Sequence, residues 1–155
     1  MIIRRALKGD IGDISKLLSQ VLEIHHNGRP DIFKGGAVKY TPAELEDIIC
    51  DNSRPIFVAE LDRRVVGYAF CIMQQHINNN ILTDVKTLYI DDLCVDEEMR
   101  GKHIGKALYE HVLDFAKGTG CYNLTLNVWE ENKNAKRFYE GLGMSVQKTV
   151  MEKIF

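Results

Sequence analysis

A polar, glycine-containing turn between two apolar segments is the first feature of this sequence that could do chemistry. It lies within residues 93–108, which read Leu-Cys-Val-Asp-Glu-Glu-Met-Arg-Gly-Lys-His-Ile-Gly-Lys-Ala-Leu. The pattern predicts a strand that leads into a helix, whose first turn has unpaired N–H groups and a positive dipole end. Such a terminus can bind an anion, and Lys102 and Lys106 add positive charge. The alternative is an ordinary strand-to-helix turn with solvated lysines.

Two adjacent acids just before this turn interrupt an otherwise apolar predicted strand at 87–95. Asp91 and Asp92 are conspicuous there, because unpaired carboxylates are costly to bury. Regular strand alternation sends neighbouring side chains to opposite faces, which places Asp91 on the face of Tyr89, Leu93 and Val95. The alternative for each acid is a solvated position near the strand end.

The elements that must position these residues alternate along the chain. Apolar, β-branched and aromatic runs predict strands at 2–6, 56–60, 65–73, 87–95 and 122–128. Helical spacing and capping signals predict helices over about 11–27, 42–50, 103–117 and 133–142, with Asp10 as the cap of the first. The stretch from Arg29 to Tyr40 is predicted to be a loop, and the tail to Phe155 to form one or two closing strands.

Length and composition predict one soluble globular domain over residues 1–155. The chain has 45% hydrophobic and 27% charged residues, and no apolar run approaches the roughly 20 residues that a bilayer requires. Residues 1–5 lack the order of a signal peptide, so we expect a cytoplasmic protein without a membrane partner. The net charge of −2 gives no reason to expect nucleic acid and mildly favours a cationic partner.

The four cysteines are widely spaced and form no C-x-x-C pair. Cys50, Cys71, Cys94 and Cys121 are therefore predicted to be free and mostly buried thiols. No helix-spaced set of ligands accompanies His25 and His26, so we expect no metal site.

The turn at 93–108 resembles the pyrophosphate loop of the GNAT superfamily, the general-control-type N-acetyltransferases. That loop reads Arg or Gln, two residues, Gly, one residue, then Gly or Ala. Arg100, Ile104 and Gly105 fall on this pattern, and His103 departs from it at the first glycine position.

A second resemblance lies downstream at the spacing that the family uses. Residues 132–144 read Asn-Lys-Asn-Ala-Lys-Arg-Phe-Tyr-Glu-Gly-Leu-Gly-Met, similar to the family's helix with Asn, Ala and an aromatic-Tyr pair that ends in Gly and an apolar residue. Together the two motifs cover roughly the C-terminal half. The N-terminal half agrees with the family in element order only.

The resemblance implies a fold, a co-substrate and its binding residues. The implied fold is α/β, a mixed and mostly antiparallel sheet of six or seven strands, with about four helices and central strands splayed between Val95 and Trp129. Acetyl-CoA would enter at that splay, and the resemblance also implies a homodimer. The implied contacts of acetyl-CoA are Leu93, Cys94, Val95, Arg100, Gly101, Lys102, His103, Ile104, Gly105, Lys106, Asn127, Asn132 and Tyr139.

For acetyl transfer to an amine, the resemblance implies Tyr139 as the acid that protonates the departing thiolate. A phenol with a pKa near 10 facing a thiol with a pKa near 8.5 makes that step uphill by about 2 kcal/mol. The alternative is a core tyrosine at helical spacing with Phe138.

The stretch at 89–95 is similar to the acidic pair of GNAT diamine and amino-sugar acetyltransferases, which implies that Asp91 lies near the acceptor. An ordinary Asp is a poor base for an alkylammonium, so orienting the cation is its simplest role, with direct or water-relayed proton abstraction left open.

The sequence thus predicts an acetyl-CoA-dependent N-acetyltransferase that acts on a small-molecule amine acceptor, a small cationic amine. Two alternatives remain at this point: an N-acetyltransferase of proteins or peptides, and a non-catalytic CoA-binding module. Cys94 as a nucleophile is disfavoured, because no histidine is placed by sequence to activate it.

Overall fold

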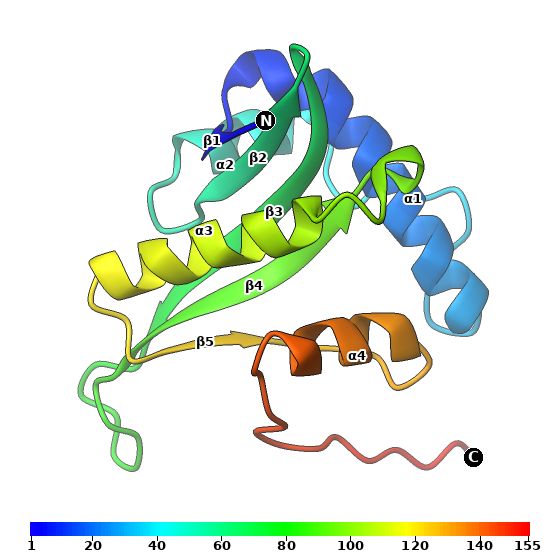
Figure 1. Cartoon of the computed structure of the whole chain (residues 1–155). Helices are drawn as coiled ribbons and strands as arrows, with labels where there is room; N and C mark the ends of the chain where they lie inside the picture. The colour runs from blue at the N-terminus through cyan, green and yellow to red at the C-terminus, as the bar shows by residue number, and fades with distance from the viewer.

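A single mixed sheet organises the chain, and the computed structural model describes all 155 residues (Figure 1). Its strands stand side by side in chain order, each antiparallel to the next except for the parallel pair β4 and β5. They are β1 (Ile2–Arg5), β2 (Ile56–Leu61), β3 (Arg64–Gln75), β4 (Lys86–Val95) and β5 (Asn123–Leu126). This confirms the predicted mixed and mostly antiparallel α/β class.

Four α-helices cover the two faces of the sheet (Figure 1). They are α1 (Ile11–Gly28), α2 (Pro42–Cys50), α3 (Ile104–Gly118) and α4 (Lys133–Gly141), with 3-10 turns η1 (Lys8–Asp10) and η2 (Glu97–Met99). Helix α2 begins where predicted, because Thr41 and Glu44 form a capping box around Pro42 at the first helical position. No helix is long and apolar enough to cross a membrane.

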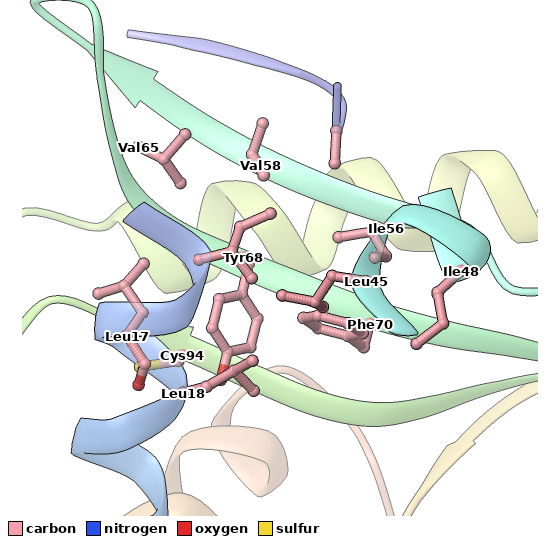
Figure 2. Close-up of a cluster of buried hydrophobic side chains, with 12 residues drawn as sticks. Leu17, Leu18, Leu45, Ile48, Ile56, Val58, Val65, Tyr68, Phe70 and Cys94 are labelled. Atoms are coloured by element: carbon pink, nitrogen blue, oxygen red, sulfur yellow. The ribbon is translucent and has the colours of Figure 1, made fainter. Parts of the chain in front are cut away.

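The sheet separates two apolar clusters of similar size. On one face, Leu17 and Leu18 of α1 and Leu45 of α2 pack with the strand residues Tyr68 and Phe70 (Figure 2). On the other face, α3 buries an apolar stripe against the same strands. That stripe is Ile104, Leu108, Tyr109, Val112 and Ala116. All four cysteines are free, and Cys71 and Cys94 are buried in these clusters, whereas Cys50 is exposed.

The pairing of β4 changes within the strand, and this change positions the site. Phe70 of β3 faces Asp92, but Cys71 faces Ile90, so Asp91 is the extra residue of a β-bulge. The parallel pairing with β5 ends at the same place, at Ile90 opposite Leu126. Beyond that point β4 and β5 separate, which is the predicted splay between Val95 and Trp129, although β5 lies at the edge of the sheet rather than at its centre.

Three predictions about the elements are wrong: the number of strands, the closing strands of the tail, and Asp10 as the cap of α1. The sheet has five strands rather than six or seven, because residues 144–155 form no strand. Asp10 makes no side-chain cap for α1, since its carboxylate accepts hydrogen bonds from the Leu7 N–H at 2.7 Å and from the Arg4 guanidinium at 2.7 and 2.9 Å. That carboxylate instead fixes η1 and the end of β1.

Candidate active site

A cavity of about 190 Å³ opens where β4 and β5 separate. Its walls come from the end of α1, the second half of β4, the segment after β5, and α4. Its lining residues are Val21, Ile24, His25, Ile90, Asp91, Asp92, Leu93, Cys94, Val95, Arg100, Leu126, Asn127, Val128, Trp129, Asn132, Ala135 and Tyr139. Since β5 no longer pairs with β4 beyond Ile90, the backbone of 91–95 on this side has no strand partner.

The bulge brings the two acids of β4 together, which corrects the prediction that they lie on opposite faces. Cys94 packs in the apolar cluster on the face covered by α1 and α2 (the α1 cluster). Leu93 and Val95 pack in the apolar cluster on the face covered by α3 (the α3 cluster). Asp91 therefore does not share a face with Leu93 and Val95, because the extra residue shifts the alternation by one position. Both carboxylates instead contact the same partner, Lys39.

Lys39 belongs to the loop between α1 and α2 and pairs with both acids. Its Nζ lies 3.0 Å from Asp91 Oδ2 and 3.8 Å from Asp92 Oδ2. Two hydroxyl groups complete the arrangement: Tyr40 donates to Asp91 Oδ2 at 3.2 Å, and Tyr68 donates to Asp92 Oδ2 at 2.9 Å. The acid pair thus holds an alkylammonium at the wall of the cavity.

Burial and the neighbouring charges have opposite effects on the pKa values of Asp92 and Lys39. Burial raises the pKa of Asp92, an effect opposed by the positive charge of Lys39 and by the hydrogen bond from Tyr68. For Lys39, burial alone would lower the pKa, but the charge of Asp92 and the hydrogen bond to Asp91 raise it overall. The lysine is therefore held as a cation, and the acid pair is suited to bind one.

Tyr139 of α4 lies on the opposite wall of the cavity. Its ring packs against Phe138 and Tyr109, with ring centroids 5.1 and 6.3 Å away, so it also belongs to the α3 cluster. Burial raises its pKa well above the ordinary value, and the negative charge of Asp92 adds to the rise. The phenol therefore keeps its proton at any physiological pH.

Two other groups on the cavity wall titrate differently from their free forms. Burial raises the pKa of the Cys94 thiol to about 12, and its Sγ lies 3.7 Å from the Leu17 carbonyl oxygen, so it is a poor nucleophile. Burial lowers the pKa of His25, whose ring stacks on Phe33 at 5.0 Å between centroids. His25 is thus a neutral imidazole near the acid pair at pH 7.

The turn before α3 lies beside the cavity. Of the acetyl-CoA contacts predicted at residues 100–106, only Arg100 lines the cavity. The residues of this turn that do not line it are Gly101, Lys102, His103, Ile104, Gly105 and Lys106. The two lysines have other neighbours, since Lys102 Nζ lies 3.3 Å from Met99 Sδ and Lys106 pairs with Glu110 at 3.7 Å.

Backbone geometry explains two residues of this turn. His103 precedes α3 in the left-handed conformation, with φ of +60°, and its side chain makes no capping hydrogen bond. A Cβ on Gly105 would lie 3.4 Å from the Phe138 ring and 3.5 Å from Val95 Cγ2. Gly105 therefore lies where α3 meets α4 and β4, with room for a Cβ at ordinary contact distances. Ile104 is buried in the core, so only its backbone faces this region.

The two predicted asparagines line the cavity from the segment after β5. Asn127 Nδ2 donates to the Tyr89 hydroxyl at 3.1 Å, which links β5 to β4 at the start of the split. Asn132 caps α4, where its Oδ1 accepts from the Ala135 N–H at 3.1 Å.

A second cavity, of about 270 Å³, adjoins the first and shares His25, Trp129 and Asn132 with it. Phe33 packs edge-on against Trp129 at 5.3 Å, and the Arg29 guanidinium lies 6.0 Å from the Trp129 ring centre. The sequence patterns missed two residues of this region above all. Lys39 lies in the loop between α1 and α2, and Trp129 lies in the segment between β5 and α4. No group of three or more His, Cys, Asp or Glu residues is placed to hold a metal ion.

The sheet splits beside the N-terminus of α3, and a tyrosine and an acid pair line the cavity at the split. This arrangement is the one expected of an acyltransferase that binds acetyl-CoA. The family model described as the acetyltransferase (GNAT) family matches residues 19–144. The chain therefore belongs to the GNAT family.

Individual relatives agree with this assignment. The chain is 41% identical over 70 residues to glucosamine 6-phosphate N-acetyltransferase of Arabidopsis thaliana, a match that covers 45% of each protein. It is 36% identical over 107 residues to the peptidyl-lysine N-acetyltransferase YjaB of Salmonella typhimurium, covering 67% of this chain and 61% of the relative. These matches span less than two thirds of either relative's own length.

Among solved structures, a mutant of the BH1408 protein of Bacillus halodurans matches with a TM-score of 0.95 and 32% identity. The match covers 100% of this chain and 99% of that protein.

Proposed function

We propose that the protein is an acetyl-CoA-dependent N-acetyltransferase whose acceptor is a small cationic amine. The observation that carries this proposal is the ion pair of Lys39 with Asp91 and Asp92, in which an alkylammonium is bound by two acids that line the cavity. Family membership supports the reaction type, because family members are acetyltransferases.

The cavity offers suitable groups for acetyl-CoA. The backbone of 93–95 pairs with β3 but not with β5, so the polar groups on its β5 side are free to bond the amides of the pantetheine arm. The N-terminus of α3 and Arg100 offer N–H donors and positive charge for the pyrophosphate. The side chains of Lys102 and Lys106 are secondary, since they contact Met99 and Glu110 instead. Acetyl-CoA supplies the acetyl group as an activated thioester.

The acids bind and orient the acceptor ammonium in this account. The amine must lose a proton before it attacks, and His25 is the candidate base on the cavity wall, since burial lowers its pKa and leaves its imidazole neutral and able to accept a proton at pH 7. Asp91 and Asp92 then serve as counter-charges that hold the cation in place, with a relaying water as the path for the proton.

Tyr139 donates its phenolic proton to the departing sulfur. Its raised pKa alone would make this donation less favourable. Burial in the cavity would also penalise a thiolate, in the way that burial raises the pKa of the Cys94 thiol on the β4 wall to about 12. The two effects offset each other, because both anions would be buried near Asp92.

A lysine side chain of a peptide is a second candidate acceptor, favoured by one observation. The occupant of the acid pair in this chain is itself a lysine. The Salmonella relative is described as a peptidyl-lysine acetyltransferase, which agrees with such an acceptor.

The proposal is tested by measuring free-thiol release from acetyl-CoA with a panel of acceptors. The panel contains diamines, polyamines, lysine, amino sugars and lysine peptides, with matched alcohols as controls. We expect release with at least one primary alkylamine and none with its alcohol. Binding of acetyl-CoA without release on any amine would favour a non-catalytic CoA-binding module instead.

A further inference from the structure

Lys39 is the only lysine whose ammonium contacts residues that line the first cavity. Its Nζ lies 3.0 Å from Asp91 Oδ2 and 3.8 Å from Asp92 Oδ2, and both acids line that cavity. The other lysine ammoniums with a partner contact residues outside the cavity lining. These are Lys8, Lys16, Lys86, Lys102, Lys106 and Lys136. Lys39 therefore presents a primary amine beside the place where the proposed acceptor amine must bind.

The stretch of chain that carries Lys39 is free to move this amine inward. Residues 34–40 belong to no helix or strand and make no backbone–backbone hydrogen bond. Tyr40 fixes the end of the stretch, because its ring stacks on Phe70 at 5.6 Å and its hydroxyl donates to Asp91 at 3.2 Å. The backbone before Lys39 can therefore shift at low cost while Tyr40 keeps Lys39 beside the acids.

The groups that acetyl transfer requires are gathered around the same carboxylates. Burial lowers the pKa of His25 and the charge of Lys39 lowers it further, so its neutral imidazole can accept a proton on the cavity wall at pH 7. Tyr139 lines the cavity and keeps its phenolic proton, because burial raises its pKa. An amine tethered beside such a site reacts at an effective concentration far above that of a free amine.

We propose that the protein acetylates its own Lys39, a step that rests on the proposed function because it uses the same acetyl-CoA site. The Lys39 ammonium loses one proton to His25, and Nζ attacks the carbonyl carbon of the thioester. The C–N bond of an amide forms and the C–S bond breaks. The departing sulfur takes a proton from Tyr139, and the acylated nitrogen then gives up a second proton, which restores the phenol. The products are N-acetyl-lysine, free CoA and one proton, so the step needs no oxidant or reductant.

The modification changes the acid pair. Acetylation removes the positive charge of Lys39, which releases Asp91 and Asp92 from their ion pair and leaves them available to an acceptor ammonium. The reaction occurs once per chain. It is slower than turnover of a free amine, because Nζ must leave its ion pair to reach the thioester, and initial rates therefore describe the unmodified protein.

The test incubates the full chain with acetyl-CoA and no added amine, starting from protein treated with a lysine deacetylase. Intact-mass spectrometry counts the acetyl groups, and peptide mapping locates them. We expect one acetyl group per chain, on Lys39, at a rate that does not depend on protein concentration. Lys39→Arg should lower total incorporation by at least about 10-fold. Lys34→Arg, a change in the same loop, is the matched control and should react like the parent.

Tyr139→Phe distinguishes catalysed from spontaneous acetylation. This variant should acetylate Lys39 roughly 100-fold more slowly than the parent, because the proton for the departing sulfur is lost. An equal rate in the two proteins, or acetyl groups spread evenly over several lysines, would overturn the inference.

Free-thiol release with the amine panel, measured on the same preparation, separates this inference from the proposed function. Release on a free amine with Lys39 left unmodified would overturn the inference and leave the proposed function intact. Acetylated Lys39 without release on any free amine would support the inference and refute the small-amine acceptor. The absence of both signals would overturn both.

Discussion

The ammonium of Lys39 lies 3.0 Å from Asp91 Oδ2, although the two residues are far apart in the chain. The next residue, Tyr40, contacts the same carboxylate oxygen across a separation of 51 positions. The pair places a lysine cation at the wall of the cavity between β4 and β5. In the proposed reaction the acceptor ammonium must take this place, so Lys39 and the acceptor compete for the same carboxylates.

Lys39→Met should lower the KM for a cationic acceptor by roughly 3- to 10-fold, because it removes the competing cation, an ion-pair effect of about 1 kcal/mol. The KM for acetyl-CoA should stay unchanged. Lys39→Arg keeps the charge and serves as the control. Steady-state kinetics with both substrates varied measures the effect, and a higher acceptor KM for the Met variant would show that Lys39 helps to bind the acceptor.

Gly105→Glu should weaken acetyl-CoA binding by at least about 10-fold, because it places a negative charge at the N-terminus of α3. Gly105→Ala controls for bulk, since its Cβ would meet Phe138 and Val95 at ordinary contact distances of 3.4 and 3.5 Å. Gly118→Glu puts the same charge at the other end of α3 and should bind like the parent. Calorimetry measures all three, and equal affinities would refute the anion site.

His103→Gly should leave acetyl-CoA binding intact and raise the melting temperature slightly. The reason is the φ of +60° at His103, which costs a residue with a Cβ about 1 kcal/mol and glycine nothing. Thermal unfolding followed by circular dichroism checks the change. A large loss of cofactor affinity would assign the imidazole a direct role in binding.

Asp91→Asn and Asp92→Asn should both raise the acceptor KM, and they should differ in stability. Asp92 is the more buried acid, with 9% of its side chain exposed against 21% for Asp91. Because burial raises the pKa of Asp92, its charge destabilises the fold as pH rises from about 4 through the folded-state pKa. Asp92→Asn should remove this dependence. Urea unfolding at pH 4 and pH 7 measures it, and parallel shifts for both variants would contradict the assignment.

The sequence patterns name Asp91, Asp92 and Tyr139, and the structure places all three on the wall of one cavity. Asp91 and Asp92 were found as acids within an apolar strand, and Tyr139 as part of a helix motif. Their mutual arrangement was wrong for the acids, since a bulge depends on how β4 pairs with β3 and leaves no mark on β4 itself. A bulge shifts every later residue to the other face.

Long-range contacts set the other limit. Lys39 reaches the acids from a loop whose composition predicts nothing beyond exposure. The tail has the β-branched residues of a strand, and it was predicted as one. A strand needs a partner edge as well as propensity, and in the structure the tail pairs with no strand.

The most direct test of the account is the turnover of Tyr139→Phe from pH 7 to pH 10. Phe keeps the ring that packs against Phe138 and Tyr109, so fold and acetyl-CoA affinity should survive while the proton for the departing sulfur is lost. We predict a fall in kcat of roughly 10- to 1000-fold, centred on the roughly 100-fold contribution that a general acid can make. Because the pKa of Tyr139 is raised, the parent should show no loss of kcat up to about pH 10. An unchanged kcat in a folded Tyr139→Phe variant would contradict the mechanism.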